Sequence, residues 1–466
     1  MGGFFAVASK EDCVADVFYG TDYHSHLGTR RGGMAVMGDR NITRFIHDIT
    51  NAQFRSKFDS DIGKMAGRSG IGVISDNEDQ PLIIGSHLGV YAIVTVGAVK
   101  NVEAITMNTF KGRTTHFSEM SGGEINATEL TATLINTEAS FAAGIKKAQD
   151  LIQGSSSMLI LSKKCIYAAR DKLGRTPIAI GKKEGAYAAT METCAFPNLG
   201  FKLERYLGPG EIVRITADGV EQLVPPGDRM QICSFLWVYY GYPASSYEGI
   251  NVEDVRNRCG AALARNDDVE VDYVGGIPDS GTGHALGYAN HKSCPYKRTF
   301  VKYTPTWPRS FMPQDQRVRD MVAKMKLIPV KDLIAGQRLL FCEDSIVRGT
   351  QLRGTIKRLY DIGAKEVHMR PACPALLHGC KFLNFSQSRS EFDLAGVRAI
   401  NALEGNPNKD RDQYADPDHP KCKEMADWIG RELGLTTLKY QRLDDLVDAI
   451  GLPKEKLCTY CWDGAE

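Results

Sequence analysis

Two adjacent acids at the end of an apolar run are the residues of this chain best placed to do chemistry. Glu343 and Asp344 follow the run Leu339–Cys342, and the small-residue segment Ser345–Thr350 comes directly after them. In a parallel sheet such a run is a buried strand, and ligands bind at the carboxyl ends of the strands. Backbone N–H groups and hydroxyls of the next segment can surround a phosphate at a helix N-terminus. Carboxylates suit ribose hydroxyls or Mg²⁺, so the pattern predicts a sugar-phosphate site; the alternative is an ordinary turn with a solvated acidic pair.

The elements expected around these acids alternate between strand and helix. Strands are predicted at 271–277, 339–342 and 367–370, and helices at 282–291 and 352–363, the second ending in a glycine cap. This βαβ order predicts a parallel sheet, which brings the small-residue loop Pro278–Gly281 beside Ser345–Thr350. The segment 405–422 has no apolar period and is predicted to be a surface loop.

The first half of the chain has a different pattern. Residues 1–230 contain many short β-like runs separated by Gly and polar turns, with convincing helices only near 125–136 and 138–153. Strand-rich sequence with a few helices predicts an α+β layered domain. A chain of 466 residues exceeds one core, so we predict two domains, 1–230 and 231–466.

Composition limits the partners. Lys plus Arg number 57 against 56 acids, and this balance favours neither nucleic acid nor a membrane surface as a partner. The sequence contains no run of about 18 apolar residues, so no membrane-spanning helix is predicted. The amino end lacks a basic leader with a long apolar segment, so we expect a cytoplasmic protein. The twelve cysteines are scattered, and most are expected to be buried thiols.

Longer stretches resemble a known enzyme family. EDSIVRGT (343–350) resembles the phosphoribosylpyrophosphate (PRPP) loop of type I phosphoribosyltransferases. Together with VDYVGGIPDSGTGHALGYA (271–289) and DIGAKEVHMRPACP (361–374), it resembles glutamine PRPP amidotransferase, over residues 1–464 and most strongly over 233–380. The resemblance implies an N-terminal-nucleophile hydrolase-like domain followed by an α/β phosphoribosyltransferase domain, and synthesis of phosphoribosylamine for purines.

The resemblance also implies roles for single residues. Glu343 and Asp344 would hold Mg²⁺ and the ribose hydroxyls, with Ser280 completing the metal site. Lys302 and Arg309 would lie on a loop that closes over pyrophosphate. The family usually has Asp at the position of Glu343, and the residues between Lys302 and Arg309 also depart from its pattern. Substrate contacts are implied for Asp279, Ser280, Ser345, Ile346, Val347, Arg348, Gly349 and Thr350.

The glutaminase chemistry of the family is predicted to be lost. That chemistry requires a thiol on the first mature residue, whose α-amino group acts as the base, and Gly2 occupies the thiol's place. The Asn-Gly oxyanion element becomes Val96-Gly97, which removes a donor that can contribute about 3 kcal/mol. The glutamine-binding arginine and aspartate are replaced near Ser75 and at Ala127.

The scaffold of that domain nevertheless persists, because Asp171–Pro177 and Leu207–Glu211 match the family. We therefore predict a domain that folds but does not hydrolyse glutamine. Cys13 is not expected to substitute for the missing thiol, because the α-amino base could not reach it.

Four cysteines predict a metal cluster. Cys458 and Cys461 form a C-x-x-C pair that resembles the C-terminal element of the family's iron–sulfur branch, and Cys233 and Cys380 match the remaining ligand positions. Four thiolates would complete a structural [4Fe–4S] site; zinc on the same thiolates and free thiols are the alternatives. Cys373 is the substitute if Cys380 is misplaced.

Three functional hypotheses follow. The first is a phosphoribosyltransferase that uses ammonia, free or from a separate glutaminase. The second is a phosphoribosyltransferase for another amine. The third is a catalytically silent PRPP-binding regulatory or scaffold subunit, paired with an active paralogue. The resemblance also implies a homo-oligomer.

Overall fold

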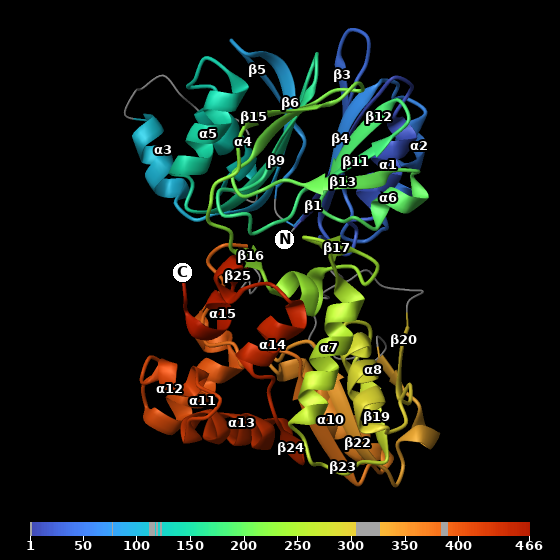
Figure 1. Cartoon of the computed structure of the whole chain (residues 1–466), viewed down its shortest axis with the longest axis vertical. Helices are drawn as coiled ribbons and strands as arrows, with labels where there is room; N and C mark the ends of the chain where they lie inside the picture. Colours follow the sequence, from blue (N-terminus) through green and yellow to red (C-terminus); the bar gives the residue numbers. More distant parts are fainter. Residues whose placement is uncertain are drawn as a thin grey trace.

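The structure is a computed structural model that describes residues 2–76, 78–110, 117, 120–121, 124–303, 327–383 and 390–466. Two halves lie one above the other along the long axis of the molecule (Figure 1). The start of the first strand and the C-terminal turn both lie near the junction between the halves.

A seven-stranded antiparallel sheet forms one layer of the amino-terminal half, in the order β13-β11-β12-β1-β4-β2-β3. Its strands are β1 (Gly3–Ser9), β2 (Arg31–Met37), β3 (Ile42–Asp48), β4 (Ser69–Ser75), β11 (Ala179–Lys183), β12 (Ala186–Thr190) and β13 (Lys202–Tyr206).

A six-stranded antiparallel sheet packs on it, in the order β15-β14-β10-β9-β6-β5. Its strands are β5 (Leu82–Ser86), β6 (Gly89–Val99), β9 (Gly154–Ser162), β10 (Ile166–Ala169), β14 (Ile212–Ile215) and β15 (Val220–Val224).

Alternating side chains make this half a four-layer structure. On β1, Phe4 and Ala6 enter the core between the sheets, whereas Phe5 and Val7 face the helices outside. Helices α1 (Val14–Asp22), α2 (Phe54–Ile62) and α6 (Ala195–Asn198) cover the seven-stranded sheet, and α3 (Val102–Phe110), α4 (Ala127–Ile135) and α5 (Phe141–Leu151) cover the other. A short hairpin, β7 (Met120–Ser121) with β8 (Glu124–Ile125), precedes α4.

A parallel sheet in the order β19-β22-β23-β24 organises the carboxyl-terminal half. Leu340 and Cys342 face one core and Leu339 and Phe341 the other, as expected of a strand buried on both faces. The elements are β19 (Tyr273–Gly276), β22 (Arg338–Glu343), β23 (Glu366–Pro371) and β24 (Thr437–Leu438), with α7 (Val252–Arg265), α8 (Gly281–Lys292) and α14 (Leu443–Ile450) on one face and α10 (Thr350–Ile362) and α13 (Pro420–Leu433) on the other.

Shorter elements complete this half. A two-stranded parallel pairing of β16 (Ile232–Cys233) with β25 (Leu457–Cys458) lies next to the junction of the halves (Figure 1). The others are a π-helix (Leu236–Tyr240), β17 (Ser246–Tyr247), β18 (Ile250–Asn251), β20 (Phe300–Lys302), β21 (Leu327–Pro329), α11 (Ala395–Glu404), α12 (Arg411–Ala415), α15 (Tyr460–Asp463) and 3-10 turns at Lys331–Leu333, Glu391–Asp393 and Lys454–Lys456.

The predicted fold class is confirmed, with an α+β half before a parallel α/β half. Two expectations were wrong. Helices α1, α2 and α3 were not predicted, and the segment 405–422 is not a plain loop, because it contains α12 and the first turn of α13. That first turn is polar, with Pro420 at its start and the His419 ring accepting the Lys421 N–H, so no apolar period marks it.

Candidate functional site

The predicted acids lie at the carboxyl edge of the parallel sheet. Glu343 ends β22, and the Asp344 carboxylate accepts hydrogen bonds from Ser280 Oγ (2.5 Å) and Ser345 Oγ (2.7 Å). A Cβ at Gly281 would lie only 2.5 Å from the Cys342 carbonyl oxygen, so glycine permits the start of α8 to approach the end of β22. The structure therefore brings together the three residues predicted to hold Mg²⁺.

The acid pair carries closely spaced negative charge. Burial and the charge of Asp344 raise the pKa of Glu343 well above its ordinary value. The backbone N–H of Asp344 also donates to Glu343 Oε1 (3.1 Å), which holds the Glu343 carboxylate beside the start of the loop. A cation would balance the charge of two adjacent carboxylates, and oxygen ligands suit Mg²⁺.

The segment Ser345–Thr350 leads into the N-terminus of α10. Gly349 precedes that helix with a φ of 74°, a conformation that favours glycine. The positive end of a 13-residue helix therefore points at the loop, as expected for a phosphate site. Ile346 anchors the loop in the core, whereas Arg348 is half exposed.

Two residues that sequence reasoning missed hold this loop. Arg398 donates from Nη2 to the Arg348 carbonyl (2.6 Å) and from Nη1 to the Asp393 carbonyl (2.8 Å). The Asp393 carboxylate lies 3.3 Å from the Arg348 guanidinium. They lie some 45–50 residues after the loop, and no local pattern marks them.

Lys302 reaches the loop that carries Ser280. Lys302 ends β20, and its Nζ donates to Asp279 Oδ2 (2.5 Å) in the Pro278–Gly281 loop. Strands β20 and β21 pair on either side of segment 304–326. Arg309 lies outside the described residues.

The four predicted cysteines are neighbours. Cys233 pairs with Cys458 across the parallel strands β16 and β25, and the Cys461 carbonyl accepts the Leu377 and His378 N–H groups (3.0 and 3.1 Å) three and two residues before Cys380. A hydrogen bond with Cys380, together with burial, raises the pKa of Cys461 well above its ordinary value. Burial and the nearby Cys458 and Cys380 thiols do the same for Cys233.

Cys373, the substitute for Cys380, lies nearer the acid pair, since burial and the charge of Asp344 raise its pKa. Among the described residues, no group of three or more His, Cys, Asp or Glu side chains has the arrangement of ligands around a single metal ion.

Gly2, the predicted nucleophile position of the amino-terminal half, has little room for a side chain. A Cβ at Gly2 would lie 2.4 Å from the Ile74 carbonyl oxygen. Val96 is buried and offers no side-chain donor where an oxyanion would need one. Burial and neighbouring acids raise the pKa of Cys13 to about 12, so this thiol stays protonated at neutral pH.

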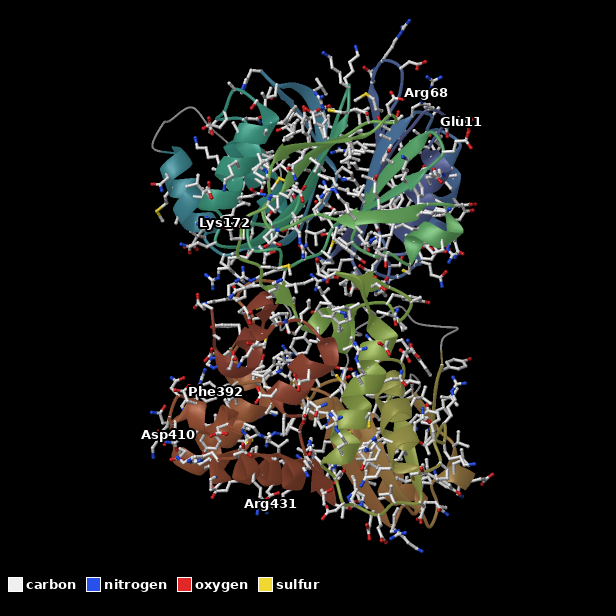
Figure 2. The ribbon with its side chains drawn as sticks, in the orientation of Figure 1. Glu11, Arg68, Lys172, Phe392, Asp410 and Arg431 are labelled. Atoms are coloured by element: carbon white, nitrogen blue, oxygen red, sulfur yellow. The ribbon has the colours of Figure 1, made fainter. Side chains whose placement is uncertain are left out.

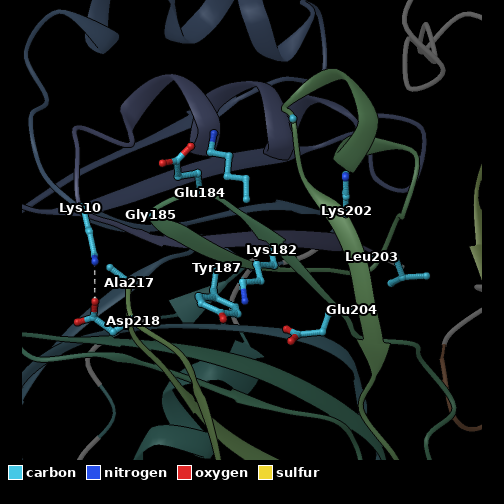
Figure 3. Close-up of a pocket in the computed structure, with 12 residues that line it drawn as sticks. Lys10, Lys182, Glu184, Gly185, Tyr187, Lys202, Leu203, Glu204, Ala217 and Asp218 are labelled. Atoms are coloured by element: carbon cyan, nitrogen blue, oxygen red, sulfur yellow. Dashed lines mark ion pairs between the residues drawn. The ribbon is translucent and has the colours of Figure 1, made fainter.

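A cavity of about 600 Å³ lies at the outer edge of the same half (Figure 3). None of the predicted site residues lines it. Charged side chains lie around it: Lys10 pairs with Asp218 (2.9 Å), and Lys182 Nζ lies 5.3 Å from the centre of the Tyr187 ring. In the described part of the chain, no helix is both long and apolar enough to cross a membrane.

Comparisons with known proteins agree with this architecture. The model of a glutamine amidotransferase domain matches residues 67–196. The chain is 28% identical to an amidophosphoribosyltransferase of Methanocaldococcus jannaschii, over 100% of this chain and 97% of that one. The structure of Bacillus subtilis glutamine PRPP amidotransferase, complexed with ADP and GMP, is similar with a TM-score of 0.85 and 26% identity, over 99% and 96% of the two chains. A second structure, described as the allosteric regulatory enzyme of purine biosynthesis, gives the same TM-score and identity, over 99% and 95%.

Proposed function

We propose that this chain, which belongs to the amidophosphoribosyltransferase family, transfers the phosphoribosyl group of PRPP to ammonia for purine synthesis. We also propose that it has no glutaminase activity of its own. The observation that carries this proposal is a contrast between the halves. Ser280, Asp344 and Glu343 meet beside the phosphate loop, whereas the space for a side chain at Gly2 is filled by the Ile74 carbonyl.

The residues at the sheet edge fit each part of PRPP. Backbone groups of Ser345–Thr350 and the N-terminus of α10 bind the 5′-phosphate. Glu343, Asp344 and Ser280 offer oxygen ligands to Mg²⁺, which typically keeps several waters and substrate oxygens and needs only one or two carboxylates. Bound Mg²⁺ neutralises charge on the pyrophosphate oxygens.

The reaction exchanges one bond for another. The bond from the anomeric carbon to the pyrophosphate oxygen breaks, and its electron pair leaves with pyrophosphate. The lone pair of ammonia forms the new carbon–nitrogen bond, and the nitrogen then releases a proton to water. Lys302, at present paired with Asp279 at 2.5 Å, is positioned to follow the departing pyrophosphate and stabilise its charge.

Ammonia must come from solution or from a separate glutaminase. The substitutions at the positions of Gly2, Val96, Ser75 and Ala127 remove the thiol, the oxyanion donor and the groups that would bind glutamine. Cys13 cannot replace the thiol, because burial keeps it protonated.

We also propose that the chain holds a [4Fe–4S] cluster on Cys233, Cys380, Cys458 and Cys461. Four buried or half-buried thiols that raise one another's pKa resist ionisation together, and a bound metal would displace their protons. Each thiolate of such a cluster binds a different iron, so the sulfurs need not surround one point. Absorption spectra and metal analysis of anaerobically purified protein distinguish iron–sulfur, zinc and free thiols.

None of the twelve cysteines forms a disulfide, which supports a reducing, cytoplasmic location, and we also propose a homo-oligomer. Analytical ultracentrifugation tests the oligomer.

The test of the transferase is pyrophosphate release from PRPP and Mg²⁺ with one nitrogen donor at a time. We expect turnover with ammonium and none with glutamine, and a loss of about 100-fold or more in Asp344→Asn. Asp332→Asn, an exposed acid away from both loops, is the matched control. Turnover with glutamine alone would refute the loss of glutaminase. Turnover only with another amine, or PRPP binding without turnover, would support the second or third hypothesis.

A further inference from the structure

A buried arginine in the amino-terminal half has no part in the chemistry described so far. Arg175 belongs to the turn Asp171–Pro177, which matches the family although the glutaminase residues do not. Its side chain is 4% exposed, and its Nε has no hydrogen-bond partner in the described structure. Because buried polar groups nearly always have a partner, an orphaned N–H on a buried cation points to a ligand site beside it.

The surroundings of Arg175 identify that site. Its carbonyl accepts the Cys233 N–H (3.1 Å), and its Nη2 donates to Gln231 Oε1 (3.1 Å), two residues before Cys233. Its Cζ lies 3.6 Å from the centre of the Phe382 ring, two residues after Cys380. The guanidinium therefore lies between two of the segments that carry the predicted ligands.

The third segment approaches from the C-terminus. Cys458 is paired with Cys233 in the parallel β16–β25 strands, and the Cys233 N–H donates to the Arg175 carbonyl, so Arg175 adjoins this strand pair. The guanidinium therefore lies among the segments that carry Cys233, Cys380 and Cys458.

We propose that Arg175 is the counter-ion of the metal–thiolate cluster, so that the amino-terminal domain forms part of the cluster's protein shell. This inference rests on the proposed cluster. Four thiolates bring four negative charges into a buried site, and a guanidinium remains charged there and offers several fixed N–H donors. Net charge and hydrogen bonds to sulfur set the reduction potential of an iron–sulfur cluster, and residues around the ligands hold them in place.

A purely structural role makes a different prediction. Arg175 also joins the halves through Gln231 and Phe382, so its loss would loosen the junction whatever its charge does. Arg175→Lys keeps the charge but loses the planar fork, whereas Arg175→Gln keeps a donor but loses the charge. If Arg175 is the counter-ion, the reduction potential of the cluster should change when the positive charge at position 175 is lost and should stay the same when that charge is kept.

The experiment uses anaerobically purified full-length protein. The midpoint potential is measured by spectroscopic titration, and metal loss is followed after addition of a chelator. We expect Arg175→Gln to lose metal at least about tenfold faster than the unmodified protein and to have a lower midpoint potential. Arg175→Lys is expected to keep a potential near that of the unmodified protein while losing metal faster.

Lys172→Gln is the matched control, because Lys172 lies in the same turn, is exposed and pairs with Asp150 (3.0 Å) (Figure 2). It should change neither quantity. Magnesium-dependent PRPP binding checks that each variant is folded. If Arg175→Gln does not fold, Arg175→Lys decides: metal loss at the rate of the unmodified protein would overturn the role of Arg175. An unchanged release rate and potential in Arg175→Gln would overturn the role of Arg175 alone. Unmodified protein without iron or zinc would overturn the cluster and this role with it.

Discussion

Restoring a cysteine at position 2 is expected to leave the amino-terminal half without glutaminase activity. A Cβ there would lie 2.4 Å from the Ile74 carbonyl oxygen, and ordinary contact begins near 3.4 Å, so the strands must separate by about 1.0 Å (3.4 − 2.4). Gly3 is paired with Ile74 in the β1–β4 ladder, so the shift disturbs a central pair of the sheet. Overpacking of this kind costs about 1–3 kcal/mol. The missing donor at Val96 separately costs about 3 kcal/mol of transition-state stabilisation.

The assay for Gly2→Cys is glutamate release from glutamine, with mass spectrometry to detect any thioester. A lower thermal midpoint and no glutamate are expected. Gly63→Cys is the control for adding a thiol, because a Cβ there has no heavy atom within 4 Å, and its thermal midpoint should not change. Glutamate release by Gly2→Cys at a rate comparable with ammonia-dependent turnover would refute the reasoning.

Two further perturbations test the transferase site. The pKa of Glu343 is raised above its ordinary 4.5, so the folded metal-free protein holds that proton more tightly than the unfolded chain, and its stability should fall as pH rises above 4.5 through the raised pKa. Thermal melts across pH should show that stability falls less steeply with pH in Glu343→Gln than in the unmodified protein. Equal slopes would contradict a raised pKa of Glu343. Arg398→Ala removes a hydrogen bond to the Arg348 carbonyl of the phosphate loop and one to the Asp393 carbonyl. It should raise KM for PRPP about tenfold, or ~1.4 kcal/mol, with little change in kcat. Steady-state kinetics would detect this rise in KM, with Lys357→Ala, an exposed position on α10, as the control. An unchanged KM in Arg398→Ala would show that Arg398 does not hold the phosphate loop.

Sequence patterns located the parallel sheet because its signals are local. The run Leu339–Cys342 is apolar at every position, and both of its faces are indeed buried. Gly363 ends α10 in the left-handed conformation expected of a cap. The acids follow the strand directly, so their place at the sheet edge also follows from local sequence.

Other features could not be predicted because they depend on distant partners. Helix α1 has only nine residues and buries Val14, Val17 and Phe18 against a sheet that the helix pattern alone does not reveal. The brace from Arg398 to the phosphate loop spans about fifty positions. The resemblance supplied the set of four cysteines, whereas spacing along the chain marked only Cys458 and Cys461 as a pair.

The pairing of β16 with β25 has a consequence for how the chain refolds. Ser234 and the Cys458 carbonyl that it contacts are 224 positions apart, so their pairing requires a very long loop to close. Contacts of such high sequence separation form slowly and late. During refolding, we therefore expect the thiols on these strands to meet slowly, and until they meet, oxidants can reach them individually. A reductant should protect these thiols most during the time before the two strands pair.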